Sequence, residues 1–476
     1  MKKRIYNHTL ALGLMALVIH ACAPKLTLKE AKTDLPKSFT AQQDSISSAN
    51  IKWSEYFNDP HLISLIDTAL ANNQELNIFM QEIEIARNEV REKKGEILPS
   101  VNVGAGAGVD KVGRYTRNGA LEANTEIEPG KEFPEPLSDF QMGATASWEV
   151  DVWRKLRNAK KAAFTRYLSS VEGRHFLVTN LIAEIAISYY ELMALDNQLA
   201  LVRQNIQIQS DAYEIVRLQK QASRVTELAV RRFEAQVLDT KSLEFDIKQR
   251  IIETENEINY LLGRYPQPIQ RNSEIFDSIV PSQVKSGLPS QLLENRPDIR
   301  QAEMNVEASK LDIQVAKARF YPSVGISAGV GYQAFNAGHL LSTPESLAYS
   351  LTGDLVAPVI NRNAIKAMYN SASSAQIQAV YDYERAVLNA YIEVANLMSR
   401  GENLQKSYDL RSRQVAAMNE SVEISNFLFK SARADYMEVL LTQREALDSR
   451  FDMIETKMLQ LHTWVDVYRA LGGGWK

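Results

Sequence analysis

The stretch PSVGISAGVGY, residues 322–332, decides how this chain folds. Its even-numbered positions from Val324 to Tyr332 are apolar, whereas its odd-numbered positions from Ser323 to Gly331 are serine or glycine. Strict alternation of this kind predicts a β-strand with one apolar face and one face of small or polar residues. The stretch PSVNVGAGAGV begins at Pro99, 223 residues before Pro322, and shows the same pattern.

The match between the two stretches extends beyond the strands and predicts a tandem duplication. Leu262-Gly263 corresponds to Leu471-Gly472 at a spacing of 209 residues. The shorter spacing places an insertion of about 14 residues in the first copy. We therefore expect a first structural repeat at 53–263, a linker at 264–290 that contains several prolines, and a second repeat at 291–476.

Each repeat is expected to contain two strands. Alternating segments place these strands at about 98–109 and 140–152 in the first repeat, and at about 321–333 and 346–357 in the second. Residues 110–140 are polar and contain glycine and proline, so we expect a long exposed loop that holds the insertion.

The rest of each repeat is expected to be helical. No proline occurs between Pro136 and Pro266 or after Pro358, and good helix formers dominate both tracts. The first tract predicts helices of about 65 and about 40 residues, which must pack side by side as coiled coils. Tight turns are expected near 221–224 and 431–434. No stretch of the mature chain is expected to form a transmembrane helix.

Composition excludes several classes of function. The chain has 476 residues, a net charge of −4 and no basic block, which argues against a nucleic-acid partner. Its six histidines lack the spacing of metal ligands, and no catalytic constellation is evident. The GAGAG run at 104–108 lacks the spacing of a phosphate-binding loop. We therefore expect no enzymatic activity, no metal and no cofactor.

The N-terminus is typical of an exported protein. Basic residues 2–4 precede an apolar run that ends at Ile19, which predicts a signal peptide over residues 1–21. The only cysteine, Cys22, follows directly and cannot form an internal disulfide. An incidental signal-peptide cysteine is the alternative to a modified one. Residues 22–52 are expected to form an extended leader.

The four strands raise the question of their partners. Their length and alternation are typical of strands that span a membrane as a β-barrel. Four strands cannot close a barrel, and an open edge in lipid leaves backbone groups without hydrogen bonds. Several protomers must therefore contribute to one barrel. A soluble sheet with a face of small residues is the alternative.

Several motifs resemble those of the TolC-like outer-membrane efflux proteins. These are LPSQLLENRPDIRQAE at 288–303, SWEVDVW at 147–153, the two Pro-Ser-Val strand starts, and Trp53 followed by Asp59-Pro60. The resemblance implies a homotrimer with a twelve-stranded barrel in the outer membrane and a long helical barrel in the periplasm. It further implies the exit duct of a tripartite pump, with a periplasmic adaptor protein and an inner-membrane pump as partners.

The position of Cys22 resembles a lipoprotein cleavage site, which implies acylation and an anchor on the periplasmic side of the outer membrane. This places the chain nearer to the branch that works with resistance-nodulation-division pumps. The cargo, whether drugs or metal ions, is not indicated. A duct of the type I secretion kind and a surface-anchored coiled-coil scaffold are the alternative functions.

A candidate gate lies at the second turn. Asp435, with Arg433 and Tyr436 beside it, resembles the acidic constriction at the periplasmic tip of the family. Alternatively, Asp435 only caps the following helix. Three further acids, Glu149, Asp151 and Asp354, fall on the polar side of the strands in the sequence pattern. We expect them to face the lumen and to favour cations.

Overall fold

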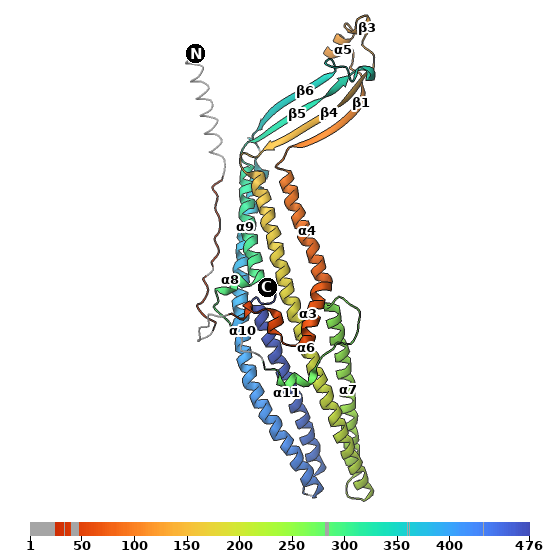
Figure 1. Ribbon diagram of the computed structural model, residues 1–476, viewed down its shortest axis with the longest axis vertical. Coiled ribbons are helices and arrows are strands. Elements are labelled where there is room, and N and C mark those ends of the chain that lie inside the picture. Colours follow the sequence, from red (N-terminus) through yellow and green to blue (C-terminus); the bar gives the residue numbers. More distant parts are fainter. Residues whose placement is uncertain are drawn as a thin grey trace. The chain divides into compact units, whose positions relative to one another are not determined.

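The computed structural model describes residues 24–32, 34–39, 47–280, 285–358, 360, 362–431 and 433–476 (Figure 1). The predicted signal peptide and Cys22 lie outside these residues. The chain divides into two compact units, and each unit takes segments from both repeats. Residues 85–167 and 304–380 form most of the strand unit, and residues 168–303 and 381–476 form most of the helix unit.

The strand unit contains one four-stranded antiparallel sheet. Its strands are β1 (Ser100–Asp110), β4 (Leu137–Val150), β5 (Ser323–Ala334) and β6 (Leu347–Val356), in the order β1-β4-β5-β6. They lie where the alternation predicts them. The two repeats meet where β4 pairs with β5, and Gly143 lies opposite Gly331 there. Both glycines are needed, because a side chain on either would collide with the backbone of the other strand.

The register gives the sheet two chemically distinct faces. One face is apolar on all four strands, and its exposed large side chains are Val101, Val103, Val109, Met142, Trp148, Ile326, Val330, Leu347, Tyr349, Leu351 and Leu355. The other face alternates glycine with serine, threonine and a few charged residues. The sheet therefore has the amphipathic pattern expected of a barrel wall.

The inserted segment is more ordered than expected. Residues 110–140 contain the short helix α5 (Arg117–Glu122) and a hairpin of β2 (Glu126–Glu128) and β3 (Lys131–Glu132). The expected long loop therefore contains short elements of secondary structure. The hydroxyl of Thr116 accepts a hydrogen bond from the amide of Gly119 at 3.1 Å, which caps α5.

Two helical hairpins dominate the helix unit. Their helices are α6 (Lys155–Gln221), α7 (Glu227–Leu261), α10 (Asn363–Lys430) and α11 (Tyr436–Ala470). The first two have 67 and 35 residues, close to the predicted lengths. The shorter elements of this unit are η1 (Ser48–Asn50), α2 (Trp53–Tyr56), α3 (Pro60–Asn72), η2 (Ser273–Ser278) and α8 (Gln291–Asn295). The helices α4 (Gln74–Gly95) and α9 (Pro297–Ala318) have residues in both units, and η3 (Ala337–His339) belongs to the strand unit.

α6 contains a window long and apolar enough to cross a membrane, contrary to our expectation for the mature chain. Because 67% of that window is buried within the protein, its apolar character is that of a core helix. Tyr189, Leu192 and Met193 of α6 are fully buried in the largest hydrophobic cluster. Tyr56 of α2 closes this cluster by stacking on Trp464 and Tyr468, with ring centroids 4.4 and 4.1 Å apart.

The duplication is visible in matched glycines at the ends of α7 and α11. Gly263 and Gly472 follow these helices with φ angles of +69° and +87°. A side chain on Gly263 would clash with the carbonyl oxygen of Asn72, and one on Gly472 with that of Asn295. These are corresponding atoms of the two repeats. Each repeat thus ends in a left-handed, crowded backbone position that only glycine accommodates.

The first described part of the leader, up to Phe39, contacts α10. In the strand unit, the buried side chain of Gln376 bonds both the N–H and the C=O of Lys29, at 3.1 and 2.8 Å. In the helix unit, the ring of Phe39 stacks on that of Tyr391 with centroids 5.4 Å apart. Residues 24–32 and 34–39 are thus extended, as expected, and side chains of α10 bind their main chain. Further along the leader, Ser48–Asn50 form η1, and the hydroxyl of Tyr468 in α11 donates to the carbonyl of Ile51 at 2.6 Å.

Candidate functional site: the polar sheet face and the two helix turns

Two of the three predicted lumen acids share the polar face of the sheet. Glu149 of β4 and Asp354 of β6 lie on either side of Gly325, in register with it. The ammonium of Lys155 lies 2.5 Å from the carboxylate of Glu149. No hydrogen bond or ion pair is seen for the carboxylate of Asp354 among the described residues.

Basic residues accompany these acids. A cavity of about 870 Å³ lies beside the polar face, and its charged lining comprises Lys93, Glu96, Glu149, Lys155, Arg319 and Asp354. Three cations thus oppose three anions. The charge of this region is balanced rather than acidic, which weakens the expectation of a preference for cations. Arg319 and Lys155 were missed in the sequence, although basic residues where a strand meets a long helix are a signal that could have identified them.

Asp151 does not lie on the polar strand face, and this expectation is corrected. It follows the end of β4 and is buried, where its carboxylate accepts hydrogen bonds from the backbone amides of Leu156 and Arg157 at 3.0 and 2.9 Å. Burial opposes ionisation, but these bonds and the Arg157 guanidinium outweigh it and lower the pKa of Asp151. Its role is to satisfy the N-terminus of α6, since the first amides of a helix lack partners.

The first helix turn, between α6 and α7, is closed by side chains. The hydroxyl of Thr226 accepts a hydrogen bond from the amide of Ala229 at 3.3 Å, which caps α7. Glu227 lies 2.5 Å from the ammonium of Lys220 and 3.0 Å from the guanidinium of Arg231. The hydrogen bond from Lys220 is the main reason that the pKa of Glu227 is lowered.

The second turn, between α10 and α11, repeats a backbone hydrogen bond of the first turn but lacks this side-chain closure. The amide of Arg433 donates to the carbonyl of Leu428 at 2.9 Å, as Arg224 does to Gln219 in the first turn. Asp435 occupies the cap position of α11, yet its exposed side chain makes no capping hydrogen bond. The alternative role of Asp435 as a side-chain cap is therefore not seen in the structure.

The structure also places the neighbours of Asp435. Tyr436 packs on a hydrophobic cluster that includes Val230 and Phe233 of α7 and Leu440 of α11, so it joins the two hairpins. Arg433 is exposed, and no ion pair between it and Asp435 is found in the described part of the turn. Of the three predicted gate residues, only Tyr436 is fixed by packing, and the two charged ones project into solvent.

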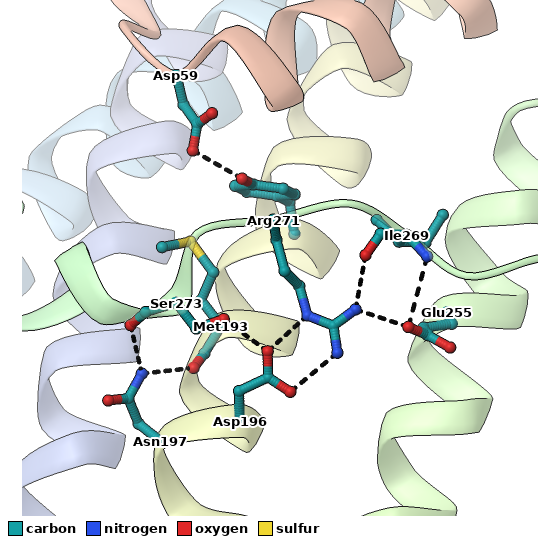
Figure 2. Close-up of polar contacts among 9 residues, drawn as sticks. Asp59, Met193, Asp196, Asn197, Glu255, Ile269, Arg271 and Ser273 are labelled. Carbon is teal, nitrogen blue, oxygen red and sulfur yellow. Dashed lines mark hydrogen bonds and ion pairs between the residues drawn. The ribbon is translucent and has the colours of Figure 1, made fainter. Parts of the chain in front are cut away.

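The linker between the repeats is bound tightly to the helices, which the sequence did not indicate (Figure 2). The Arg271 guanidinium makes a two-pronged contact with the Asp196 carboxylate of α6 at 2.6 and 2.9 Å. It also donates to Glu255 of α7 at 2.6 Å. At the other hairpin, the ammonium of Lys457 in α11 donates to the carbonyl of Ile279 at 2.5 Å. The linker therefore connects both hairpins.

Comparison with known proteins agrees with these features. The family model described as outer membrane efflux protein matches residues 65–264 and 288–473, which cover both repeats. The cation efflux system protein CusC of Escherichia coli K12 is 25% identical over 468 residues, covering 97% of this chain and 98% of that protein. The pyoverdine export outer membrane protein OpmQ of Pseudomonas aeruginosa is 25% identical over 425 residues, covering 89% of this chain and 88% of that protein.

The fold also matches solved structures. The MtrE outer membrane channel of Neisseria gonorrhoeae, in its open state, has a TM-score of 0.82 at 24% identity. The match covers 96% of this chain and 99% of that one, so the whole fold is shared. Since the family model spans more than half of the sequence, the chain belongs to the outer membrane efflux protein family and is an efflux channel of the outer membrane, not an enzyme.

Proposed function

We propose that three copies of this chain form one closed conduit, with a twelve-stranded barrel in the outer membrane and a helical barrel in the periplasm. The observation that carries this proposal is the four-stranded sheet. One of its faces is apolar on every strand. Each outer strand, β1 and β6, pairs with its inner neighbour along one edge, and no described strand pairs with its other edge. In lipid, unpaired strand edges cost several kcal/mol for each unsatisfied backbone group, so the edges must join those of other copies.

The conduit would pass small molecules that an inner-membrane pump delivers through a periplasmic adaptor protein. A pump of the resistance-nodulation-division type fits the lipoprotein branch that Cys22 suggests. Two relatives of equal identity are named for different cargoes, a cation and pyoverdine. This supports a duct that is not specific for its cargo, which can be a drug or a metal ion.

Cys22 would be acylated and would tether the mature N-terminus to the periplasmic side of the outer membrane. Intact-mass measurement of the mature protein tests this, with an N-terminal lipid on Cys22 as the expected result. A mature chain without lipid would contradict the anchor but not the conduit.

The second turn would form the gate of the conduit. Threefold symmetry would bring three Asp435 carboxylates towards one axis, where they repel one another unless cations compensate. The exposed and uncapped side chain of Asp435 supports this role, because it is free to bind a cation or a basic group of a docking partner. Arg433 and Tyr436 would flank it.

Native mass spectrometry in detergent tests the assembly. We expect a stable trimer that dissociates on heating, and the heated and unheated forms should migrate differently on a gel. A stable monomer or dimer would contradict the closed barrel and would favour the coiled-coil scaffold.

A further inference from the structure

His462 is a largely buried titratable side chain that the proposed conduit does not use. It lies on α11, next to the fully buried Leu461 and near Trp464, which belong to the largest hydrophobic cluster. Its imidazole donates a hydrogen bond to the backbone carbonyl of Ile187 in α6. The ring therefore occupies the seam where α11 of the second repeat packs against α6 of the first, which we call the α6–α11 seam.

One nitrogen of this ring has no hydrogen-bond partner. Nε2 is buried, and no donor or acceptor bonds it within the part of the chain that the structure describes. In the neutral ring this atom is an acceptor, whereas in the imidazolium it carries a proton and a share of the positive charge. A buried charged donor without a partner costs more free energy than a neutral acceptor without one. The seam therefore accommodates the neutral ring and disfavours the charged one.

The charged groups around the ring do not offer it a ready partner. The carboxylate of Glu191 in α6 lies 3.3 Å from the guanidinium of Arg250. The carboxylate of Asp466 in α11 lies 3.2 Å from that of Arg469. Arg400 of α10 is itself positively charged and opposes a second positive charge nearby. Both neighbouring acids are thus already in ion pairs, and the nearby base repels an imidazolium.

These influences together lower the pKa of His462. Burial is the main cause, and the charge of Arg400 acts in the same direction. The two carboxylates and the hydrogen bond to Ile187 oppose it only in part. Because the pKa is lower in the folded protein than in the unfolded chain, the neutral ring contributes stability that is present above the unfolded pKa. That contribution is lost as pH falls through the folded value.

The other histidine of the long helices has the opposite surroundings. His175 of α6 lies 3.3 Å from the carboxylate of Glu172, so protonation strengthens its contact. The first repeat also lacks a counterpart of His462, because the position 209 residues earlier is Glu253, which is exposed. On the long helices, the arrangement at His462 is therefore confined to the α6–α11 seam.

We propose that His462 is a proton-sensitive contact, in which the neutral ring holds α11 against α6 and its protonation loosens the seam. Both helices belong to one protomer, so this inference does not depend on the proposed trimer. α11 begins directly after the second turn. Acid would therefore loosen the attachment of the helix that carries Tyr436 and follows Asp435.

Hydrogen exchange of the full-length protein in detergent tests this proposal. It would be measured at about pH 7.5 and about pH 5.0, above and below the ordinary pKa of histidine, and corrected for intrinsic rates. In wild type we expect several-fold faster exchange at the lower pH in residues 458–466 of α11 and 183–191 of α6. His462→Gln keeps a donor for Ile187 but does not titrate, so this acceleration should disappear.

Two further variants make the test specific. His462→Leu removes both ring nitrogens and should also abolish the acceleration, so it decides the question if the glutamine variant does not fold. His175→Gln is the matched control, because it removes a titrating histidine of α6 and leaves His462 in place. It should keep the acid response of wild type. Residues 235–245 of α7 report any general effect of acid on the helices.

Equal acceleration in wild type and in the His462 variants would overturn the proposal, because other groups would then open the seam. Unchanged exchange of the wild-type seam at low pH would also overturn it, as would loss of the response in His175→Gln. Native mass spectrometry of the same samples keeps the proposed function separate. Absence of a trimer would contradict the conduit, whereas the α6–α11 seam is judged by exchange alone.

Discussion

The two helix turns of this molecule share a backbone hydrogen bond but differ in their side chains. In the first turn, Thr226 caps a helix and Glu227 lies between two cations. In the second, the corresponding Asp435 has no capping bond, and Tyr436 replaces the charged pair with packing. The duplicated turns thus keep a common backbone hydrogen bond. They differ in their side chains, which close the first turn but leave the Asp435 carboxylate of the second turn exposed.

The repeat-ending glycines are where the two copies should behave alike. Gly263→Ala and Gly472→Ala should each destabilise the protein by about 2 kcal/mol or more, because a left-handed residue gains a side chain that meets a carbonyl oxygen. Urea titrations in detergent would measure this loss. Gly95→Ala, where the added carbon meets nothing within 4 Å, is the control. A large effect in one repeat alone would mean that the equivalence does not extend to energetics.

Substitutions just before the long helices α6 and α10 should affect stability differently in the two repeats. Asp151→Ala should cost about 1–2 kcal/mol of stability, because the N-terminus of α6 loses its buried acceptor. The corresponding position in the second repeat is Ile360, which is 88% exposed, so Ile360→Ala should be nearly neutral.

Acid should reproduce the loss caused by Asp151→Ala. The pKa of Asp151 is lowered in the folded protein, so its contribution is present above the unfolded pKa and is lost as pH falls through the folded value. Stability measured against pH should therefore fall less steeply in the variant than in wild type. Parallel curves for the two proteins would contradict the assignment.

Alanine substitutions in the two turns should change the stability of the protein less. Thr226→Ala should cost about 1 kcal/mol through loss of the cap, whereas Asp435→Ala should cost less, because it removes no hydrogen bond. In planar bilayers the order should reverse. Asp435→Ala should raise the resting conductance and reduce block by multivalent cations, while Thr226→Ala should conduct like wild type. An Asp435→Ala trimer that conducts like wild type would remove the gate assignment.

The smallest effect concerns Glu227. Its pKa is lowered chiefly by Lys220, so its contribution is present at neutral pH and is lost as pH falls through the lowered value. Because the pair is exposed, salt should screen it. After correction for intrinsic rates, hydrogen exchange at 218–226 should accelerate on acidification in wild type but not in Glu227→Gln. An equal acceleration in both proteins would show that other groups open the turn.

Periodic features of the sequence predicted most of the fold. The alternation at 322–332 and the absence of proline after Pro358 determine strands and long helices, because each is a local signal repeated over many residues. The site was less predictable. Asp151 fits the alternation, but the strand ends at Val150 and the helix that follows captures its carboxylate. Arg271 gave no signal, because its partners Asp196 and Glu255 lie on helices distant in sequence.

Because the linker contacts α11 far from its first turn, a small rotation of the helix at that contact would produce a large displacement at the turn. Lys457, held by the carbonyl of Ile279, lies 21 residues after Tyr436, where the helix begins. At 1.5 Å per residue, the segment between them is about 30 Å long. A rotation of about 10° around this attachment would displace Asp435 by about 5 Å, given that length. A movement at the linker of the size of one side-chain rearrangement would therefore become, at the tip, a displacement larger than the diameter of a water molecule.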